Sequence, residues 1–301
     1  MTLRTNDVNQ LITEYINDIE NSGRASSNTL QAYKRDLGKF AEFASGREIK
    51  DINSVNADVI GEFKEYLNDC GLSVSSSSRT LSALRSFFCA LISNGIVESN
   101  PAKEIHNDKP EKRDTNILSQ KDIELLLAQP NQKDIKGIRD KAMLELLYAT
   151  GIKVSELIDL NIDDLNIQIS FLKVGNDDKQ RFIPLYKLAV KSLQNYVLVS
   201  RKMLVTNEKE NALFVNCNGE RMTRQGVWKL IKYYAAKADI KADITPHTLR
   251  HSFAAHLLQN GADIHDIQEI LGHSDISSTQ RYAQFLKDKV SKSYIKFHPR
   301  A

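Results

Sequence analysis

Residues Thr245–Tyr282 read T-P-H-T-L-R-H-S-F-A-A-H-L-L-Q-N-G-A-D-I-H-D-I-Q-E-I-L-G-H-S-D-I-S-S-T-Q-R-Y. His247 and Arg250 stand three positions apart in a run with helical apolar spacing, so they share one helix face. His273 follows in L-G-H, and Tyr282 comes nine positions after it. A cation stabilises charge on phosphoryl oxygens, an imidazole moves protons near neutral pH, and a phenol forms a covalent intermediate. The stretch therefore predicts attack on a phosphodiester without a metal.

This pattern resembles the signature of the tyrosine recombinase (lambda-integrase-like) family, which reads P-H-x-L-R-H-S-F-A and then L-G-H-S-x-I-S-T-T-Q-x-Y. Three further motifs, at Met143–Leu157, Arg221–Trp228 and His298–Ala301, are similar to the XerC/XerD type of that family, with XerD the most similar. The resemblance covers nearly the whole chain. It implies a site-specific DNA recombinase that cuts and rejoins DNA.

The resemblance also assigns roles to residues. Tyr282 attacks a DNA phosphodiester and forms a 3′-phosphotyrosyl link with a free 5′-hydroxyl. Arg250 holds two oxygens of the phosphate, His247 helps proton transfer, and His273 hydrogen-bonds a non-bridging oxygen. The phosphotyrosine keeps the bond energy, so no ATP, metal or other cofactor is expected. Tyr294 is the nearest alternative nucleophile, but it lacks the L-G-H context.

Two positions depart from the family pattern. Lys153 stands where the family has an arginine, and lysine keeps the charge but loses the planar two-point fork. The family's catalytic lysine, the acid for the leaving oxygen, belongs in a hairpin turn where this chain has Asn176, which cannot donate a titrating proton. Lys179 and Lys173 flank this turn as candidate acids, and the predicted site includes Lys179. Glu156 matches an acidic residue that supports this region in the family.

Three functions stay open at this point. The first is an active Xer-like recombinase, and the second is a DNA-binding homologue with weakened or absent catalysis, because of Lys153 and Asn176. The third is an enzyme like a type IB topoisomerase, which shares the chemistry; the XerD-like N-terminal part argues against it. The first two both predict sequence-specific DNA binding, but of these two only the recombinase predicts a covalent adduct. Dimer resolution, element integration and inversion remain alternatives for the outcome.

The resemblance further implies partners. Four protomers would bind two DNA duplexes that carry a specific recombination site, as a homotetramer or together with a paralogous Xer-type recombinase. The final segment, Lys287–Ala301, would dock on a neighbouring protomer. The first residues lack the character of a signal peptide, and no apolar run approaches the roughly 20 residues of a membrane span. We therefore expect a cytoplasmic protein without membrane contact.

Charge and cysteine content exclude some other classes. The 301 residues include 41 Lys and Arg against 38 Asp and Glu, but residues 1–110 hold only 12 against 15, so the basic excess lies in the remainder. This distribution fits either a polyanionic ligand or an ordinary solvated surface. Cys70, Cys89 and Cys217 are scattered and form no C-x-x-C, which suggests neither a disulfide framework nor a zinc site. Cys89, in F-F-C-A-L-I, is expected in the core.

The N-terminal part is predicted to be a small helical domain. Apolar residues recur at helical spacing near 7–22, 28–43, 56–67 and 81–92, the last after the serine run Ser73–Ser78. We expect the run to form a solvated loop and helix cap; the alternative is that the run and Arg79 contact phosphates. With the resemblance, residues 1–106 become a core-binding (SAM-like) domain that grips DNA, followed by a polar linker over 107–116.

The catalytic domain is predicted over residues 117–301 as mixed α+β, which makes the whole chain mainly α. Ser119 and Asp122 resemble a capping box, and helices are expected to about 128, over 135–150 and over 154–160. Residues 167–185 predict a β-hairpin, 212–216 a further short strand, and the rest helices. His251 and His256 are interpreted as structural and His265 as a surface residue.

Overall fold

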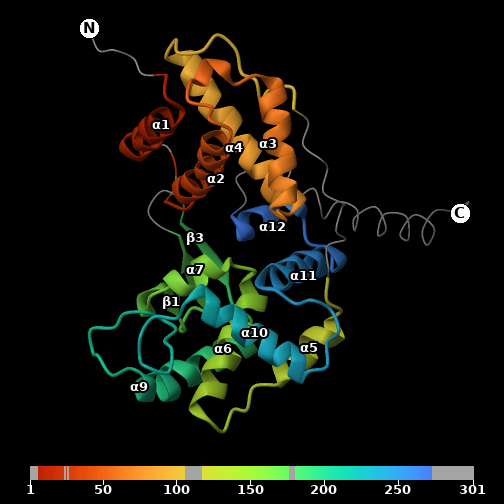
Figure 1. The fold of residues 1–301 in the computed structure, drawn as a ribbon. Helices are drawn as coiled ribbons and strands as arrows, with labels where there is room; N and C mark the ends of the chain where they lie inside the picture. Colours follow the sequence, from red (N-terminus) through yellow and green to blue (C-terminus); the bar gives the residue numbers. More distant parts are fainter. Residues whose placement is uncertain (1–5, 24, 26, 106–116, 176–179, 273–301) are drawn as a thin grey trace, which may run out of the picture. The chain divides into compact units, whose positions relative to one another are not determined.

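The computed structural model describes residues 6–272 apart from 24, 26, 106–116 and 176–179 (Figure 1). The chain divides into two compact units, Met1–Arg113 and Asp114–Ala301. Of the predicted site residues, Tyr282, His273 and Lys179 lie outside the described residues. The predicted linker and Asn176 also lie outside them.

The described part of the first unit consists mainly of helices that surround an aromatic core (Figure 1). Phe40, Phe63, Phe87 and Phe88 are fully buried there and contact other rings edge to face. Side-chain caps fix three of the helix starts, because Asp7, Asn56 and Ser73 each accept a backbone N–H from the first turn. The helices are α1 (Val8–Ser22), α2 (Ser27–Gly46), α3 (Ala57–Asp69) and α4 (Val74–Ser93), with a 3₁₀ turn at Ile52–Ser54.

Two expectations for α4 are wrong. The serine run does not form a loop ahead of the helix; Ser73 is the cap, and Ser75–Ser78 form the first turns of α4. Serine is a weak helix former, but burial of the following apolar face outweighs its low propensity. Cys89 is exposed, because Phe87 and Phe88 take the core face of this part of the helix.

The second unit is built around α6, whose side chains are buried over most of its length. α6 packs against α5, α8, α9 and α11. It ends at Gly151, whose φ is +59°, and a Cβ there would lie 2.4 Å from the ring of Phe253 on α11. The helices in the described part of this unit are α5 (Gln120–Ala128), α6 (Ile135–Thr150), α7 (Val154–Asp159), α8 (Lys187–Asn195), α9 (Arg201–Leu204), α10 (Arg224–Lys237), α11 (Pro246–Gln259) and α12 (Ile264–Leu271). The described residues also include a 3₁₀ turn at Ile162–Asp164 and a π-helical turn at Tyr196–Ser200.

A small antiparallel sheet, in the order β1-β2-β3, accompanies these helices. The predicted hairpin is confirmed: β2 (Phe171–Val174) pairs with β3 (Arg181–Pro184), and Val174 faces Arg181 where the turn begins. β1 (Leu165–Asn166) joins the edge of β2. The predicted fold class, mainly α with a small sheet, is thus confirmed.

The strand predicted at 212–216 is wrong, since only isolated bridges form there, Asn161 with Ala212 and Val215 with Arg221. Arginine side chains instead donate hydrogen bonds to backbone carbonyls that a paired strand would need as acceptors. Arg201 donates to the Ala212 carbonyl at 2.7 and 3.0 Å, and Arg139 donates to the Val215 carbonyl at 3.2 Å.

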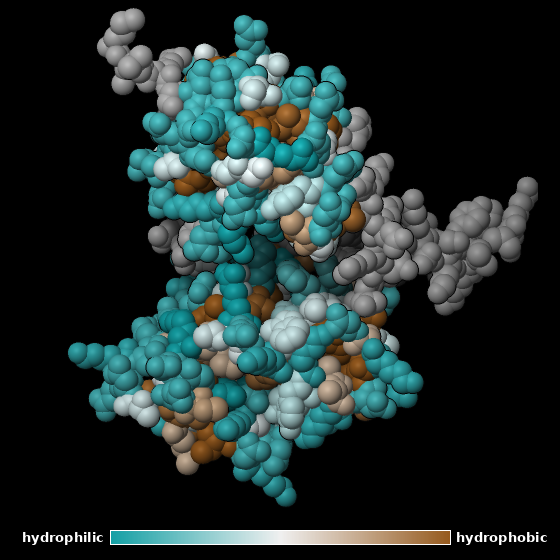
Figure 2. Space-filling model, in the orientation of Figure 1, coloured by the Kyte–Doolittle hydropathy of each residue, from teal (hydrophilic) through white to brown (hydrophobic). Residues whose placement is uncertain are grey.

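The visible surface of both units is mostly hydrophilic, with scattered apolar residues (Figure 2). Within the described ranges, no helix has the length and apolar character needed to cross a membrane.

Candidate active site

Arg250 lies on α11 with only 5% of its surface exposed. The helix begins with Thr245 as its cap and Pro246 in the first turn, a combination that fixes where α11 starts. One end of the Arg250 guanidinium donates to the Gly151 carbonyl at the end of α6, and Nη2 donates to the Leu271 carbonyl at 2.8 Å. Arg250 therefore joins two segments that are distant in the sequence.

Lys153 lies two residues after Gly151 and directly precedes α7. Its side chain is exposed, and its backbone N–H donates to Glu156 Oε2 at 2.8 Å across the first turn of α7. The Glu156 carboxylate also accepts two hydrogen bonds from Arg181, at 3.0 Å from Nη1 and 2.9 Å from Nη2. Burial alone would raise the pKa of Glu156, but the hydrogen bonds and charge of Arg181 outweigh it, so the pKa is lowered. Glu156 stays ionised and supports the Lys153 backbone.

Two arginines hold the C-terminal end of α12. Arg181 Nε donates to the Ile270 carbonyl at 2.7 Å, beside the Leu271 carbonyl that Arg250 binds. The last carbonyls of a helix lack intrahelical partners, and cations are favourable at this end of its dipole. Gly272 follows with φ +63°, and a Cβ there would lie 2.8 Å from Arg181 Nη1. The chain thus leaves α12 in a fixed position one residue before His273.

The other predicted histidines divide into two groups. His247 is exposed in the first turn of α11, three residues before the buried Arg250. His256 is buried and bonded at both nitrogens, with Nε2 2.9 Å from the Leu118 carbonyl and Nδ1 2.9 Å from the Tyr148 hydroxyl. The structural interpretation of His256 is confirmed, and so is the surface position of His265, which is exposed.

The two candidate acids differ in what the structure describes. Lys173 on β2 forms an ion pair with Asp164, with Nζ 3.0 Å from Oδ1. Lys179 lies outside the described residues, so its role stays a prediction. Among the residues that are described, no cluster of three or more His, Cys, Asp and Glu side chains could hold a metal ion.

Arg181 supports the site, although no sequence motif assigns it a role. The sequence feature that points to Arg181 is K-Q-R, at the end of the predicted hairpin turn. Nothing in the sequence indicated that its partners would be Glu156 and Ile270, because these lie 25 and 89 positions away.

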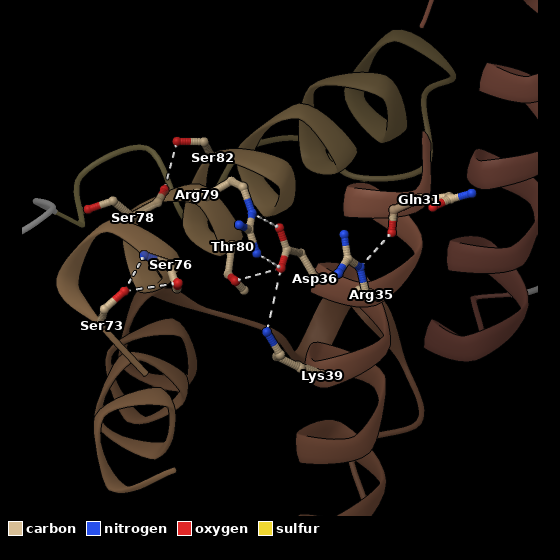
Figure 3. A network of polar contacts seen from close by, with 10 residues as sticks. All are labelled: Gln31, Arg35, Asp36, Lys39, Ser73, Ser76, Ser78, Arg79, Thr80 and Ser82. Atoms are coloured by element: carbon tan, nitrogen blue, oxygen red, sulfur yellow. Dashed lines mark hydrogen bonds and ion pairs between the residues drawn. The ribbon is translucent and has the colours of Figure 1, made fainter. Parts of the chain in front are cut away.

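A second polar cluster lies between α2 and α4 in the first unit (Figure 3). Asp36 is fully buried and accepts hydrogen bonds from Arg79 Nε at 2.7 Å, Arg79 Nη2 at 2.9 Å and Thr80 Oγ1 at 3.1 Å. Lys39 Nζ lies 3.5 Å from the same carboxylate, at Oδ1. Half of the Arg79 side chain remains exposed. Asp36 therefore fixes a cation that still faces the solvent.

Comparison with known proteins identifies the family. A model described as phage integrase family matches residues 116–289, and a second, described as phage integrase N-terminal SAM-like domain, matches residues 12–95. The tyrosine recombinase XerD of Staphylococcus epidermidis is 41% identical over 295 residues, which cover 98% of this chain and 100% of that protein. The chain belongs to the phage integrase family of tyrosine recombinases. The predicted Xer-type recombinase, an enzyme of DNA strand cleavage and religation, is thus confirmed.

Solved structures agree with this family in fold. The XerA recombinase is 26% identical, with a TM-score of 0.55, and the match covers 98% of this chain and 100% of that one. The Tn1549 transposon integrase, solved in complex with transposon right end DNA, is 21% identical, with a TM-score of 0.78 and coverage of 95% and 99%. The partner of this chain is DNA because the chain belongs to a family of enzymes that cut and rejoin DNA strands.

Proposed function

We propose that this recombinase cleaves DNA with Tyr282 as nucleophile, in a site completed by Arg250, His247, His273, Lys153 and Lys179. The observation that carries the proposal is the pair of carbonyls bound by Arg250. Gly151 lies two residues before Lys153, and Leu271 lies two residues before His273. A buried arginine between these two segments supports a pocket in which their following side chains converge on one phosphate.

The reaction would proceed by in-line displacement. The Tyr282 oxygen forms a bond to phosphorus, the bond from phosphorus to the 5′ oxygen breaks, and the leaving oxygen takes a proton from Lys179. His247 assists removal of the phenol proton, while Arg250 and His273 stabilise the charge that builds on the non-bridging oxygens. Attack by a second strand's 5′-hydroxyl reverses the step.

We also propose a larger assembly, which the family membership supports. Residues 1–106 would grip one side of the DNA and residues 117–301 would carry the chemistry, joined by the linker over 107–116. The half-exposed Arg79 supports a DNA-facing role for the first unit. Four protomers, alone or with a paralogous recombinase, would exchange strands between two duplexes in the cytoplasm. The similarity to XerD favours resolution of chromosome dimers as the outcome.

A second candidate is a recombinase with weakened or absent catalysis. Lys153 lacks the two-point fork of the family's arginine, and Lys173, one of the two candidate acids, is already paired with Asp164. These features favour slow cleavage on a site that the protein binds normally.

The test is a single-turnover assay on a nicked suicide duplex. Its site is first selected from a random-sequence duplex library by binding to the full chain. Wild type should form a covalent protein–DNA adduct, and Tyr282→Phe should bind equally but form none. Tyr294→Phe, the matched control, should form adduct as wild type does. Adduct from Tyr282→Phe would overturn the assignment of the nucleophile, and its absence from wild type on a bound site would favour the weakened homologue.

A further inference from the structure

Arg181 belongs to one segment and contacts two others, and each of the three leads to a residue of the proposed site. It begins β3, two residues after Lys179. Its Nη atoms bind Glu156, which also accepts the Lys153 backbone N–H. Its Nε binds the carbonyl of Ile270, three residues before His273.

We infer that Arg181 is a positioning residue of the cleavage site, which sets the relative positions of the start of β3, the start of α7 and the end of α12. This inference rests on the proposed function, because it assumes that Lys153, Lys179 and His273 act on one phosphate. Arg181 itself does not touch the DNA in this role. It acts through Glu156 and the Ile270 carbonyl.

The burial of the pair supports such a role. The Arg181 and Glu156 side chains are only 12% and 19% exposed, and the two-point geometry permits one orientation of the guanidinium. With both Nη atoms committed to Glu156, the position of Nε is fixed, and so is the carbonyl that it binds. An arginine held in this way couples the position of α7 to the position of the end of α12.

Gly272 is a second, independent sign of this coupling. A Cβ at this position would lie 2.8 Å from Nη1 and 3.0 Å from the central carbon of the Arg181 guanidinium. The backbone of Gly272 therefore passes directly against the guanidinium, and a side chain at this position would have to displace it.

The variant Arg181→Lys tests the geometry of the guanidinium separately from its positive charge. Arg181→Lys keeps the positive charge but cannot bind both Glu156 oxygens and the Ile270 carbonyl in one plane. Because a misplacement of about 1 Å can cost about 10²-fold in rate, we expect adduct formation at saturating protein to slow by about 10- to 100-fold. The DNA dissociation constant should stay within about threefold of wild type, since no contact to DNA is lost.

The matched control is Arg201→Lys. Arg201 on α9 also donates to backbone carbonyls, those of Glu210 and Ala212, but it contacts none of the three segments. Arg201→Lys should lower the melting temperature without changing the adduct rate of the folded protein. An equal slowing by Arg201→Lys, or an Arg181→Lys protein as fast as wild type, would overturn the inference. If Arg181→Lys does not fold, Glu156→Gln, which removes the charge but keeps the shape, is expected to show the same loss of rate.

Amide hydrogen exchange in α12 tests the positioning independently of catalysis. Loss of a charged hydrogen bond to Ile270 should speed exchange in the last turn of α12 by about tenfold in Arg181→Lys but not in Arg201→Lys. Unchanged exchange would overturn the positioning role. If wild type forms no adduct while the exchange difference appears, the proposed function fails and the coupling through Arg181 stands.

Discussion

Asp36 on α2 and Arg79 on α4 form a two-point ion pair, with Arg79 Nε 2.7 Å from Oδ2 and Nη2 2.9 Å from Oδ1. The carboxylate is fully buried, whereas half of the arginine side chain is exposed. Losing Arg79 and losing Asp36 have unequal consequences for stability, because an unpaired Arg79 can be hydrated whereas an unpaired Asp36 cannot.

Asp36→Asn should destabilise the first unit by about 1–3 kcal/mol, since the amide keeps the shape but leaves charged hydrogen bonds unmade. Urea unfolding of the full chain measures the change in midpoint. Asp18→Asn, at an exposed position on α1, is the control and should stay within about 0.5 kcal/mol of wild type. Equal midpoints for Asp36→Asn and wild type would contradict the stabilising role of the pair.

The same pair predicts acid sensitivity. Burial alone would raise the pKa of Asp36 above its ordinary value of 3.8, but the hydrogen bonds and charge of Arg79 outweigh burial and lower it. The unfolded chain then binds the proton more tightly than the folded one does. The stabilisation is therefore complete above about pH 5 and is lost as the pH falls through the lowered pKa. Urea midpoints from pH 7 to 2 should converge for wild type and Asp36→Asn, and a constant difference would refute the linkage.

Burial of His256 predicts a second dependence of stability on pH, at a higher pH than that of Asp36. Burial lowers its pKa from 6.5 despite the hydrogen bond with the Leu118 carbonyl. A carbonyl only accepts, so Nε2 donates and Nδ1 accepts from Tyr148 in the neutral ring. The unfolded histidine takes up a proton first, so this contribution is present above about pH 6.5 and is lost as the pH falls below it.

His256→Phe should remove this pH dependence and cost about 2–3 kcal/mol, because the Tyr148 hydroxyl and Leu118 carbonyl lose their partner. Thermal melts between pH 8 and 5 measure both effects. His265→Gln, at an exposed position, is the control. A slope that persists unchanged in His256→Phe would assign the titration to another group.

Lys153→Arg should speed adduct formation, by up to about 10²-fold if the added fork contacts the phosphate in the transition state. DNA affinity should be nearly unchanged. Asn176→Lys should add a further gain if Lys179 does not already act as the acid. Single-turnover cleavage of the nicked duplex measures both. A rate that stays equal or falls in Lys153→Arg would mean that the pocket has adapted to lysine.

Binding of the selected site should depend steeply on salt. If about six phosphates are contacted, the affinity should fall by roughly 10³-fold between 50 and 200 mM monovalent salt. Fluorescence anisotropy with a labelled duplex gives the slope. Tyr282→Phe should give the same slope, and an affinity independent of salt would argue against extensive contacts to the DNA backbone.

The sequence by itself determined the helices, the hairpin and the family. Apolar spacing and caps such as Ser119 act within a few residues, so they can be recognised locally. The pattern from His247 to Tyr282 identified the recombinase because the chemistry requires particular residue types at fixed spacing. Prediction from neighbouring residues was wrong at Ser75–Ser78 and at Cys89, because burial of the surrounding side chains decided which face of α4 turns toward the core.

Only the tertiary structure decided how the site is supported. Arg250 binds a carbonyl 99 positions away, and Arg181 binds one 89 positions away. Backbone carbonyls at helix ends are identical in every residue type, so the sequence carries no sign of which side chain will bind them. Packing of α6, α11 and α12 brings these carbonyls to the two arginines, and α11 packs on α12 through a small apolar cluster that includes Phe253, Ile267 and Leu271.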